Sequence, residues 1–308
     1  MTQHQRYDDI FGDLDGVKVL YDEPMSRHAS LRLGGRADAL VITEHEAQLL
    51  TIVRRLKKSG IAFMPVGNLT NLIVRDGGYR GVILWMRGLE DVHMLSEPAG
   101  VHCIEAQAGA SLSRVVSLAA ARELTGFEFC AGIPGSVGGA LWMNAGAYGS
   151  EIKDVLVSMT VIDGQGEMKV LRREDISFGY RVSNLPADVI ILKAVFQLVP
   201  GDGASIRGRI AEIIAWRHEK HPLRYPSAGS VFKNPPGLPA GRLIEDLGLK
   251  GMRRGDAQVS TLHANFIVNK GRATADDVLA LIHLIQDKAE KEKGIVLDTE
   301  VIIVGENP

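Results

Sequence analysis

The sequence predicts an α+β fold, and three of its features point to that class. Some segments carry apolar residues at the spacing of amphipathic helices, and others are alternating or continuous apolar runs typical of strands. The two kinds of segment follow one another without the regular strand–helix–strand order of a doubly wound parallel sheet. The chain also contains no low-complexity segment and no internal repeat of roughly 20 to 50 residues, which argues against a repeat architecture.

In the first half of the chain, two helices frame a set of strands. Leu49, Leu50, Val53 and Leu56 fall on one face of the first predicted helix. A polar, turn-rich segment separates the first two strands. The elements expected here are a helix over 44–58, strands over 61–67, 81–86 and 101–110, and a helix over 111–124.

A hairpin is predicted next, over 155–172, because two alternating runs flank the turn sequence DGQG at 163–166. A longer and mostly apolar strand follows over 189–199. It ends at PGDG, residues 200–203, where a cluster of turn-forming residues marks the best candidate for a domain boundary.

The last third is predicted to combine three helices with two strands. Thr274 and Asp277 resemble a capping box at the start of the last helix, and Gly294 would end it. Gly248 or Gly251 would end the short helix before it. The elements expected are helices over 205–219, 240–251 and 274–293, and strands over 265–271 and 295–305.

Composition and charge exclude several classes of protein. A chain of 308 residues suggests about two or three domains, and 45% apolar with 23% charged residues is ordinary for a globular protein. The net charge of −2, with both signs interspersed, argues against a nucleic-acid binder. The polar N-terminus does not resemble a secretory signal, and no apolar run of about 18 residues predicts a membrane span. We therefore expect a cytoplasmic protein with no nucleic-acid partner, no membrane insertion and no obligate protein partner.

The cysteines and histidines do not suggest a metal site. Cys103 and Cys130 lie in apolar surroundings and are expected to behave as small buried hydrophobic residues. His218 and His221 stand in the sequence HEKH, which is not the HExxH pattern of zinc enzymes. No cysteine or carboxylate is spaced to complete a site, so we expect no metal ion.

One segment is unusually rich in glycine. AGIPGSVGGALWMNAGAYG, residues 131–149, has six glycines and no charge in nineteen residues. Because each glycine inside a helix or strand costs about 1 kcal/mol relative to alanine, the segment suggests that something approaches the backbone closely. The P-loop pattern is absent, and the nearest approach to a dinucleotide fingerprint, GQGEMK at Gly164, lies in the predicted hairpin turn.

A second segment of similar character is VGNLTNLIVRDGGYRG, residues 66–81, directly after a predicted strand. Gly67, Asn68, Thr70 and Asn71 combine accessible backbone N–H groups with short polar side chains, a combination that suits phosphate oxygens. The two segments could together enclose a dinucleotide. The residues alone leave a second interpretation open, in which both segments are tight turns that let strands pack closely.

Seven motifs, taken in order, resemble one enzyme family. They are SLRLGGRAD, GNLTNLIVRDGGYRGV, AGIPGSVGGALWMNAGAYGSEI, FGYRVS, AGSVFKNPPGLPAGRLIEDLGLKG, VSTLHANFIVN and VLDTEV. They closely resemble the UDP-N-acetylenolpyruvoylglucosamine reductases of peptidoglycan synthesis, also named UDP-N-acetylmuramate dehydrogenases. The resemblance runs from about Ser30 to Gly305. Because only about 50 residues separate Arg181 from Ser230, the chain resembles the shorter class, which lacks an insertion carrying a tyrosine loop.

The resemblance implies two domains. An FAD-binding domain of the vanillyl-alcohol-oxidase (PCMH) type is expected over 1–200, in two subdomains of about 1–80 and 81–200. A C-terminal α+β substrate-binding domain is expected over 201–308. This type of domain binds FAD without a Rossmann fingerprint, in agreement with the absence of that pattern. The resemblance implies non-covalent FAD, with NADPH as the hydride donor.

The same resemblance assigns the cofactor contacts to the two glycine-rich segments. The family usually has Gly-Ser where this chain has Leu69-Thr70; Thr70 keeps the hydroxyl, whereas a leucine does not easily adopt a positive φ. The implied cofactor-binding residues are Gly67, Asn68, Leu69, Thr70, Asn71 and Leu72 along the pyrophosphate, and Gly132, Ile133, Pro134, Gly135, Ser136, Gly138, Gly139, Asn144, Gly146 and Ala147 around the flavin and its diphosphate.

Three residues match the family's catalytic positions. The family reduces an enolpyruvyl ether to a lactyl ether: NADPH reduces FAD, a hydride passes from flavin N5 to C3, and C2 is then protonated. By this resemblance Arg181 would bind the carboxylate as charge builds up, and Glu300, in an apolar strand, would donate a hydrogen bond from a carboxyl kept neutral by burial. Ser230 would protonate C2. Without the resemblance, the three would read as a surface arginine, an outward-facing strand residue and a turn serine.

Substrate contacts are implied for four residues. Tyr180, Lys233 and Asn234 match family positions near the substrate. Arg217 belongs to WRHEKHPLR, residues 216–224, whose cations could meet the diphosphate of a nucleotide sugar. A charge run of this kind is more often the solvated end of a helix.

Two other functions remain as alternatives. The first is a flavin oxidase of the same superfamily that tethers FAD covalently, since Cys130 immediately precedes the glycine-rich segment. The motif GSVFKNP and Glu300 argue against it. The second is a non-catalytic flavoprotein that binds a nucleotide sugar. The presence of matching residues at all three catalytic positions argues against it.

Overall fold

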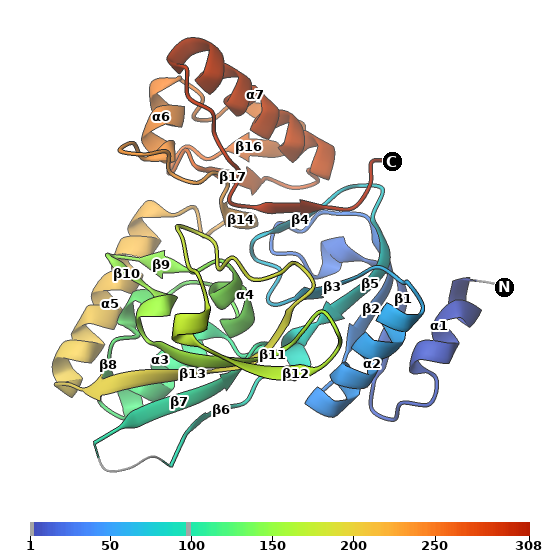
Figure 1. Ribbon diagram of the computed structural model, residues 1–308. Helices are drawn as coiled ribbons and strands as arrows, with labels where there is room; N and C mark the ends of the chain where they lie inside the picture. The colour runs from blue at the N-terminus through green and yellow to red at the C-terminus, as the bar shows by residue number, and fades with distance from the viewer. Residues whose placement is uncertain (1–2, 97–99) are drawn as a thin grey trace. The chain divides into compact units, whose positions relative to one another are not determined.

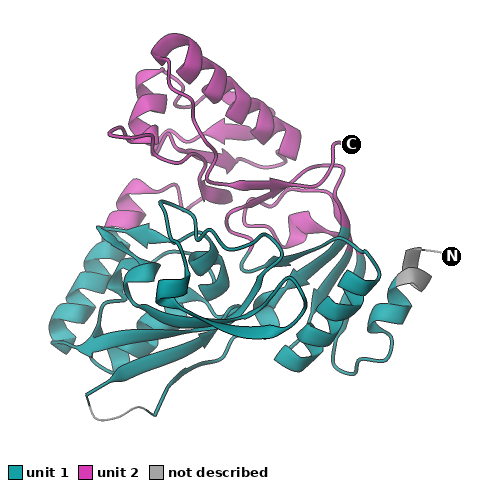
Figure 2. Cartoon of the chain, in the orientation of Figure 1, with its two compact units in different colours: residues 1–21, 39–68, 81–215 teal, residues 22–38, 69–80, 216–308 magenta. Residues whose placement is uncertain are grey.

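The structure is a computed structural model that describes residues 3–96 and 100–308, and the chain forms two compact units (Figure 2). Unit 1 comprises residues 1–21, 39–68 and 81–215, and unit 2 comprises residues 22–38, 69–80 and 216–308. Each unit therefore combines segments from distant parts of the sequence. The predicted functional division at residue 200 remains a prediction.

The first sheet has the strand order β1-β2-β5-β3, with β3 and β5 parallel. Its strands are β1 (Lys18–Pro24), β2 (Arg36–Ile42), β3 (Phe63–Val66) and β5 (Tyr79–Trp85), accompanied by helices α1 (Gln3–Phe11) and α2 (Glu46–Lys58). The predicted helix over 44–58 is confirmed. Its buried face contains Leu49, Val53 and Leu56 as expected, with Ile52 buried in addition and Leu50 only half-buried.

The larger sheet of unit 1 is antiparallel, in the order β12-β11-β13-β7-β6, with β8 paired to the end of β13 (Figure 1). The strands are β6 (Val92–Met94), β7 (His102–Gln107), β8 (Leu124–Thr125), β11 (Leu156–Ile162), β12 (Met168–Arg172) and β13 (Ile190–Pro200). β11 and β12 confirm the predicted hairpin. Asp163 Oδ1 closes its turn by accepting the N–H groups of Gln165 and Glu167, both at 2.9 Å. The Lys169 ammonium and these amides lower the pKa of Asp163 to about 2.

Helices α3 (Leu112–Ala121) and α4 (Val137–Trp142) contact this sheet, and α5 (Gly203–Lys220) follows it in the chain. The short strands β9 (Gly146–Ala147) and β10 (Ser150–Glu151) form a separate hairpin. Phe127 and Phe196 meet edge to face in the core, with ring centroids 5.2 Å apart. Cys103 and Cys130 are both buried, as the sequence predicts.

Unit 2 contains an antiparallel sheet in the order β14-β17-β16-β15 and a parallel pair, β4 with β18. The strands are β4 (Leu72–Val74), β14 (Ser227–Ser230), β15 (Arg253–Arg254), β16 (Ala257–Val259), β17 (Phe266–Asn269) and β18 (Ile302–Val304). Helices α6 (Ala240–Asp246) and α7 (Ala275–Lys293) contribute to its core, where Phe232, Ile244 and Ile282 are at most 1% exposed. Full burial stabilises each such side chain by about 1.5–3 kcal/mol.

The ends of α7 form as the sequence predicts. Thr274 Oγ1 accepts the N–H of Asp277 at 3.1 Å, and Asp277 Oδ2 accepts the N–H of Thr274 at 3.1 Å. Gly294 adopts φ 65° directly after the helix. Gly248, with φ 69°, follows the end of α6, so that helix ends before Gly251.

The last predicted strand is much shorter than expected. The final strand covers only 302–304, whereas the apolar run predicts 295–305. The residues before β18 instead donate or accept backbone hydrogen bonds with residues 231–233, so they cannot form a regular ladder with β4.

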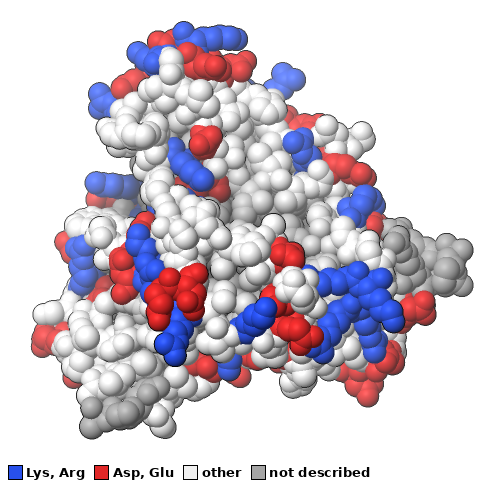
Figure 3. Space-filling view, in the orientation of Figure 1, with Lys and Arg blue, Asp and Glu red and all other residues white. Residues whose placement is uncertain are grey.

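The face shown in Figure 3 carries basic and acidic side chains interspersed. Among residues 3–96 and 100–308, no helix has both the length and the apolar character needed to cross a membrane. Within these same ranges, no three His, Cys, Asp or Glu side chains lie together so that they could hold a metal ion.

Candidate active site

The glycine-rich segment 131–149 begins as an anchored loop. Three backbone hydrogen bonds of 2.8–3.0 Å join residues 135–138 to residues 108–112. Ser136, only 1% exposed, caps α4 by accepting the N–H of Gly139 at 3.3 Å. The path of this loop is therefore set by the protein itself.

The two glycine-rich segments meet at Gly67. A Cβ atom at Gly67 would lie 1.9 Å from Ser136 Oγ, so the tight-turn interpretation holds at this position. Gly132, Pro134 and Gly139 are exposed, which leaves an uncharged edge of small residues accessible. Such an edge admits a flat ring system and its phosphates close to the peptide groups, and it fits the FAD that the sequence predicts.

Leu69 adopts a positive φ, contrary to the expectation for a leucine. Its φ is 54°, its side chain is 4% exposed and its carbonyl accepts the N–H of Ser30 at 3.1 Å. Burial and this hydrogen bond hold a conformation that costs on the order of 1–3 kcal/mol. Asn144, Tyr148 and Arg181 also have positive φ, at 43°, 54° and 58°. Strained backbone of this kind occurs at functional sites, and these four residues lie in or beside the predicted site segments, although Asp22, Arg32, Glu123 and Asn184 also have positive φ.

Asn144 joins three segments of unit 1. Its side chain is fully buried; Nδ2 donates to the Gly179 carbonyl at 2.9 Å, and Oδ1 accepts the N–H of Lys153 at 3.4 Å. The nitrogen and the oxygen of the Asn144 side-chain amide thus both form hydrogen bonds within the protein. Its predicted contact with the cofactor remains a prediction.

Arg181 lies in a tight turn rather than after a strand as a surface arginine. Gly179 and Val182 exchange backbone hydrogen bonds of 2.9 and 3.4 Å on either side of it. The guanidinium donates from Nη2 to the Gly146 carbonyl at 3.0 Å and stacks over the Tyr180 ring at 5.0 Å. The turn therefore brings Arg181 to the glycine-rich segment, and Tyr180, 47% exposed, lies beside it.

Ser230 and Glu300 are brought together in unit 2. Ser230 is the last residue of β14, opposite Phe266, and not a turn serine. The carbonyl of the next residue, Val231, accepts the N–H of Glu300 at 2.8 Å and that of Val301 at 3.4 Å. Because one carbonyl takes both amides, the chain bends here, and Glu300 precedes β18 rather than lying in a strand as predicted.

Asn71, a predicted cofactor residue, reaches the same place. Its Nδ2 donates to the Glu300 carbonyl at 3.0 Å, a contact across 229 residues of sequence that no motif indicates. Asn71, Ser230 and Glu300 therefore share one part of unit 2. Arg181 and the 131–149 segment belong to unit 1.

The predicted substrate residues of unit 2 have different surroundings. Lys233 is held through its backbone, which donates to the Asp298 carbonyl at 2.9 Å, and its side chain is half-buried. Asn234 Oδ1 accepts the N–H of Ala240 at 2.9 Å and so caps the start of α6. Arg217 lies in the last turn of α5. The substrate contacts of these three residues and of Tyr180 remain predictions.

A pair of histidines near this region is not singled out by the sequence. The rings of His221 and His263 lie 5.6 Å apart, and both contact Phe266 at 5.0 Å. Burial, then the charges of Arg217 and His263, lower the pKa of His221 to about 4. Burial also lowers the pKa of His263. The pair is therefore neutral at neutral pH.

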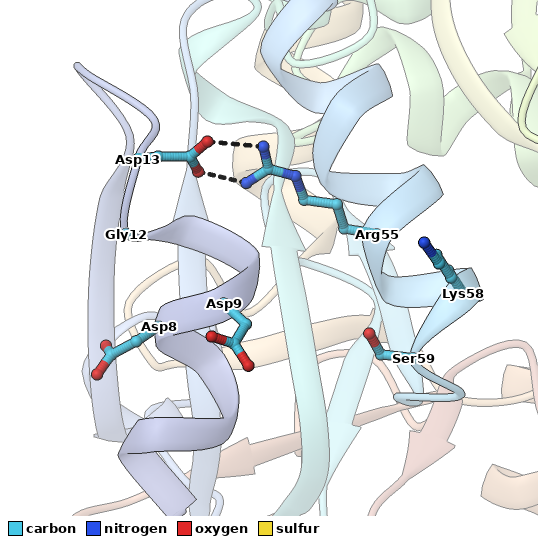
Figure 4. A pocket seen from close by; sticks show the side chains of 7 residues that line it. All are labelled: Asp8, Asp9, Gly12, Asp13, Arg55, Lys58 and Ser59. Atoms are coloured by element: carbon cyan, nitrogen blue, oxygen red, sulfur yellow. Dashed lines mark hydrogen bonds and ion pairs between the residues drawn. The ribbon is translucent and has the colours of Figure 1, made fainter.

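Two of the cavities in unit 1 are lined by none of the predicted site residues. One of about 750 Å³ is lined by residues from α1, α2 and their flanks, where Asp13 and Arg55 point toward one another (Figure 4). Arg55 Nη2 donates to Asp13 Oδ2 at 2.9 Å and Nη1 to the Ile10 carbonyl at 2.9 Å, which ties the N-terminal segment to α2. The other, of about 450 Å³, lies between α5 and β8 and includes Tyr148.

Comparison with known proteins agrees with these observations. Residues 221–304 match the family model of the UDP-N-acetylenolpyruvoylglucosamine reductase C-terminal domain, and residues 37–172 match an FAD binding domain. Both matches confirm the predicted α+β fold, with its FAD-binding and C-terminal parts.

Full-length relatives carry the same name. The chain is 50% identical to the UDP-N-acetylenolpyruvoylglucosamine reductase of Syntrophus aciditrophicus over 94% of this chain and 93% of the relative. It is 44% identical to that of Geobacillus kaustophilus over 98% and 97% of the two chains. The crystal structure of the Thermus caldophilus reductase superimposes with a TM-score of 0.78 and 33% identity, covering 94% of this chain and 99% of that one. The chain is thus an oxidoreductase with an FAD-binding domain, and it belongs to the UDP-N-acetylenolpyruvoylglucosamine reductase family.

Proposed function

We propose that this protein reduces the enolpyruvyl ether of UDP-N-acetylglucosamine enolpyruvate to the lactyl ether of UDP-N-acetylmuramate, with NADPH as the electron donor. The observation that carries the proposal is the similarity to reductases of this name over nearly the whole of both chains. The anchored glycine-rich loop supports it, as does the backbone hydrogen bond that joins Glu300 to Val231, the residue after Ser230.

FAD would be held by the two glycine-rich segments, at 67–72 and 132–147. The accessible edge formed by Gly132, Pro134 and Gly139 carries no charged side chain and includes two glycines, so the ring and the phosphates can approach the backbone closely. Bound FAD supplies the hydride that C3 of the enolpyruvyl group receives. FAD is proposed to be bound non-covalently, since Cys130 is completely buried.

Arg181 is proposed to bind the carboxylate of the enolpyruvyl group. Addition at C3 moves negative charge onto this carboxylate, and a guanidinium offers a fixed fork of donors for it. Its stacking on Tyr180 and its bond to the Gly146 carbonyl restrict its position, which favours a geometry prepared before the substrate arrives.

Ser230 is proposed to give the proton to C2, and Glu300 to stabilise the same charge. A hydroxyl is a weak acid, but a carbanion next to a carboxylate is basic enough to take its proton when the two are aligned. Ser230 lies at the end of a paired strand and Glu300 is bonded to the following residue, so both side chains start from a fixed backbone. Tyr180, Arg217, Lys233 and Asn234 are proposed to contact the nucleotide sugar.

The test is an anaerobic absorbance trace of the purified protein. We expect a flavin absorbance band at about 450 nm that NADPH bleaches and that the enolpyruvyl nucleotide sugar restores. Recovery with oxygen but not with the nucleotide sugar would favour the flavin oxidase alternative. Flavin that stays with the denatured protein would show a covalent link and would also contradict the proposal.

A further inference from the structure

A short hairpin holds the carbonyl to which Arg181 is bonded. β9 and β10 pair antiparallel, with Glu151 directly opposite Gly146. A Cβ atom at Gly146 would lie 2.7 Å from Glu151 Cγ, so the Glu151 side chain lies directly over this glycine. The Gly146 carbonyl accepts the hydrogen bond from Arg181 Nη2 at 3.0 Å. Glu151 therefore packs against the peptide that holds the guanidinium.

The turn that carries Arg181 is tied to this hairpin at a second point. Asn144, just before β9, donates to the Gly179 carbonyl at 2.9 Å, and Gly179 closes the turn around Arg181. Asn144 Oδ1 also accepts the N–H of Lys153, just after β10. Because Asn144 is fully buried, these bonds are protected from water. Both ends of the hairpin are thus coupled to the turn of Arg181.

Three groups act on the Glu151 carboxylate. Lys153 forms an ion pair with it, and the side chains of Glu151 and Lys153 are only 24% and 29% exposed. Burial raises the pKa of Glu151, but the hydrogen bonds from Lys153 and Asn144 and the charges of Lys153 and Arg181 together hold it below its ordinary value. At neutral pH the residue is an anion in the field of Arg181.

We infer that Glu151 is a positioning residue for Arg181: its carboxylate and the hairpin it closes hold the guanidinium in the orientation that receives the substrate carboxylate. Without the anion, the long arginine side chain loses the attraction that helps to fix its orientation and gains rotational freedom, which must be lost again when ligand binds. The inference rests on the proposed function, because it takes the carboxylate of the substrate as the partner of Arg181.

The test compares two ligands by calorimetry on the FAD-loaded full chain: UDP-N-acetylmuramate, which has the lactyl carboxylate, and UDP-N-acetylglucosamine, which lacks it. We expect Glu151→Gln to weaken binding of the first about tenfold and of the second less than about twofold, because only the first needs the oriented guanidinium. Glu105→Gln is the matched control. Glu105 is also a half-buried glutamate of unit 1 and pairs with Lys193 at 3.0 Å, and we expect no change with either ligand.

A double-mutant cycle separates positioning from a merely structural role. In an Arg181→Ala background, Glu151→Gln should weaken UDP-N-acetylmuramate binding by less than about twofold, since the group through which it acts is gone. A tenfold loss of affinity in this background would overturn the inference. So would equal weakening of the binding of both ligands in the single variant Glu151→Gln, or tighter binding in that variant. If Glu151→Gln does not load FAD, Glu151→Asp probes the same contact, and unchanged discrimination between the ligands there overturns it too. If the wild-type protein does not distinguish the two ligands, the role of Arg181 in the proposed function fails first, and this inference fails with it.

Discussion

The two parts of the candidate site are built in different ways. The segment 131–149 in unit 1 exposes backbone, is fixed by hydrogen bonds exchanged with residues 108–112, and includes non-glycine residues at positive φ. The Ser230–Glu300 region in unit 2 presents side chains from the end of a strand and from a bend bonded to it. A site made of backbone is sensitive to added volume, whereas a site made of side chains is sensitive to the loss of a functional group.

Glu300→Gln should strongly reduce turnover through the Ser230–Glu300 region, and it should spare the glycine-rich region. Removing a charged or acidic group that stabilises a transition state costs on the order of 10²–10³ in kcat. We expect a loss of this size in steady-state turnover with the enolpyruvyl nucleotide sugar, at unchanged flavin content. Asp298→Asn, two residues away, is the control, because only its backbone carbonyl contacts Lys233. An equal loss in both variants would show that the bend, and not the carboxyl group, is what matters.

Gly67→Ala should mainly affect the glycine-rich region rather than the Ser230–Glu300 region. The added Cβ would lie 1.9 Å from Ser136 Oγ and 2.9 Å from Ser136 Cβ, and Ser136 cannot rotate away without losing its bond to Gly139 N. We expect a loss of about 1–3 kcal/mol in the free energy of unfolding, as for other overpacked sites, together with a lower flavin content. Denaturant unfolding and the ratio of flavin to protein absorbance measure the two effects.

Gly208→Ala provides the matched control for that substitution. Gly208 lies inside α5 with no atom close to the added Cβ, so alanine should raise the free energy of unfolding by up to about 1 kcal/mol. Equal flavin content in Gly67→Ala and Gly208→Ala would remove the distinction between a backbone site and a side-chain site.

The smallest effect should appear in the pH dependence of unit 2. The pKa of His221 is lowered to about 4 in the folded state from an ordinary value near 6.5, so the unfolded chain binds the proton more readily. Its contribution to stability is therefore complete above about pH 6.5 and is lost as the pH falls toward 4. We expect hydrogen exchange to accelerate in this window for residues 221–230 before it does for residues 131–149. His221→Phe, which keeps a ring against Phe266, should reduce that difference, and an unchanged profile would exclude His221 as the cause.

The sequence predicts many of the regular elements well, for identifiable reasons. Thr274, Asp277 and Gly294 place both ends of α7, because capping is a local interaction. The glycines of 131–149 mark the backbone site because few other residues allow such close approach. The resemblance to one family supplies what these patterns alone leave open, including the choice between tight turns and a cofactor site.

What the sequence does not predict depends on contacts between distant residues. No local pattern shows that Asn71 donates to the Glu300 carbonyl, or that Val231 accepts two amides, so that β18 begins only after Glu300. Leu69 is the clearest case. A leucine alone disfavours positive φ, and the buried side chain and the bond from Ser30 N, distant in the chain, are what hold it there.

The most direct measurement follows both half-reactions in Ser230→Ala by stopped-flow absorbance. The account assigns Ser230 only to protonation of C2, so bleaching by NADPH should proceed at the wild-type rate. Restoration of the flavin spectrum by the enolpyruvyl nucleotide sugar should slow by about 10²–10⁴-fold, the usual contribution of a positioned proton donor. If both phases slow equally, or if neither changes, Ser230 does not have the role assigned to it and the account of the site is wrong.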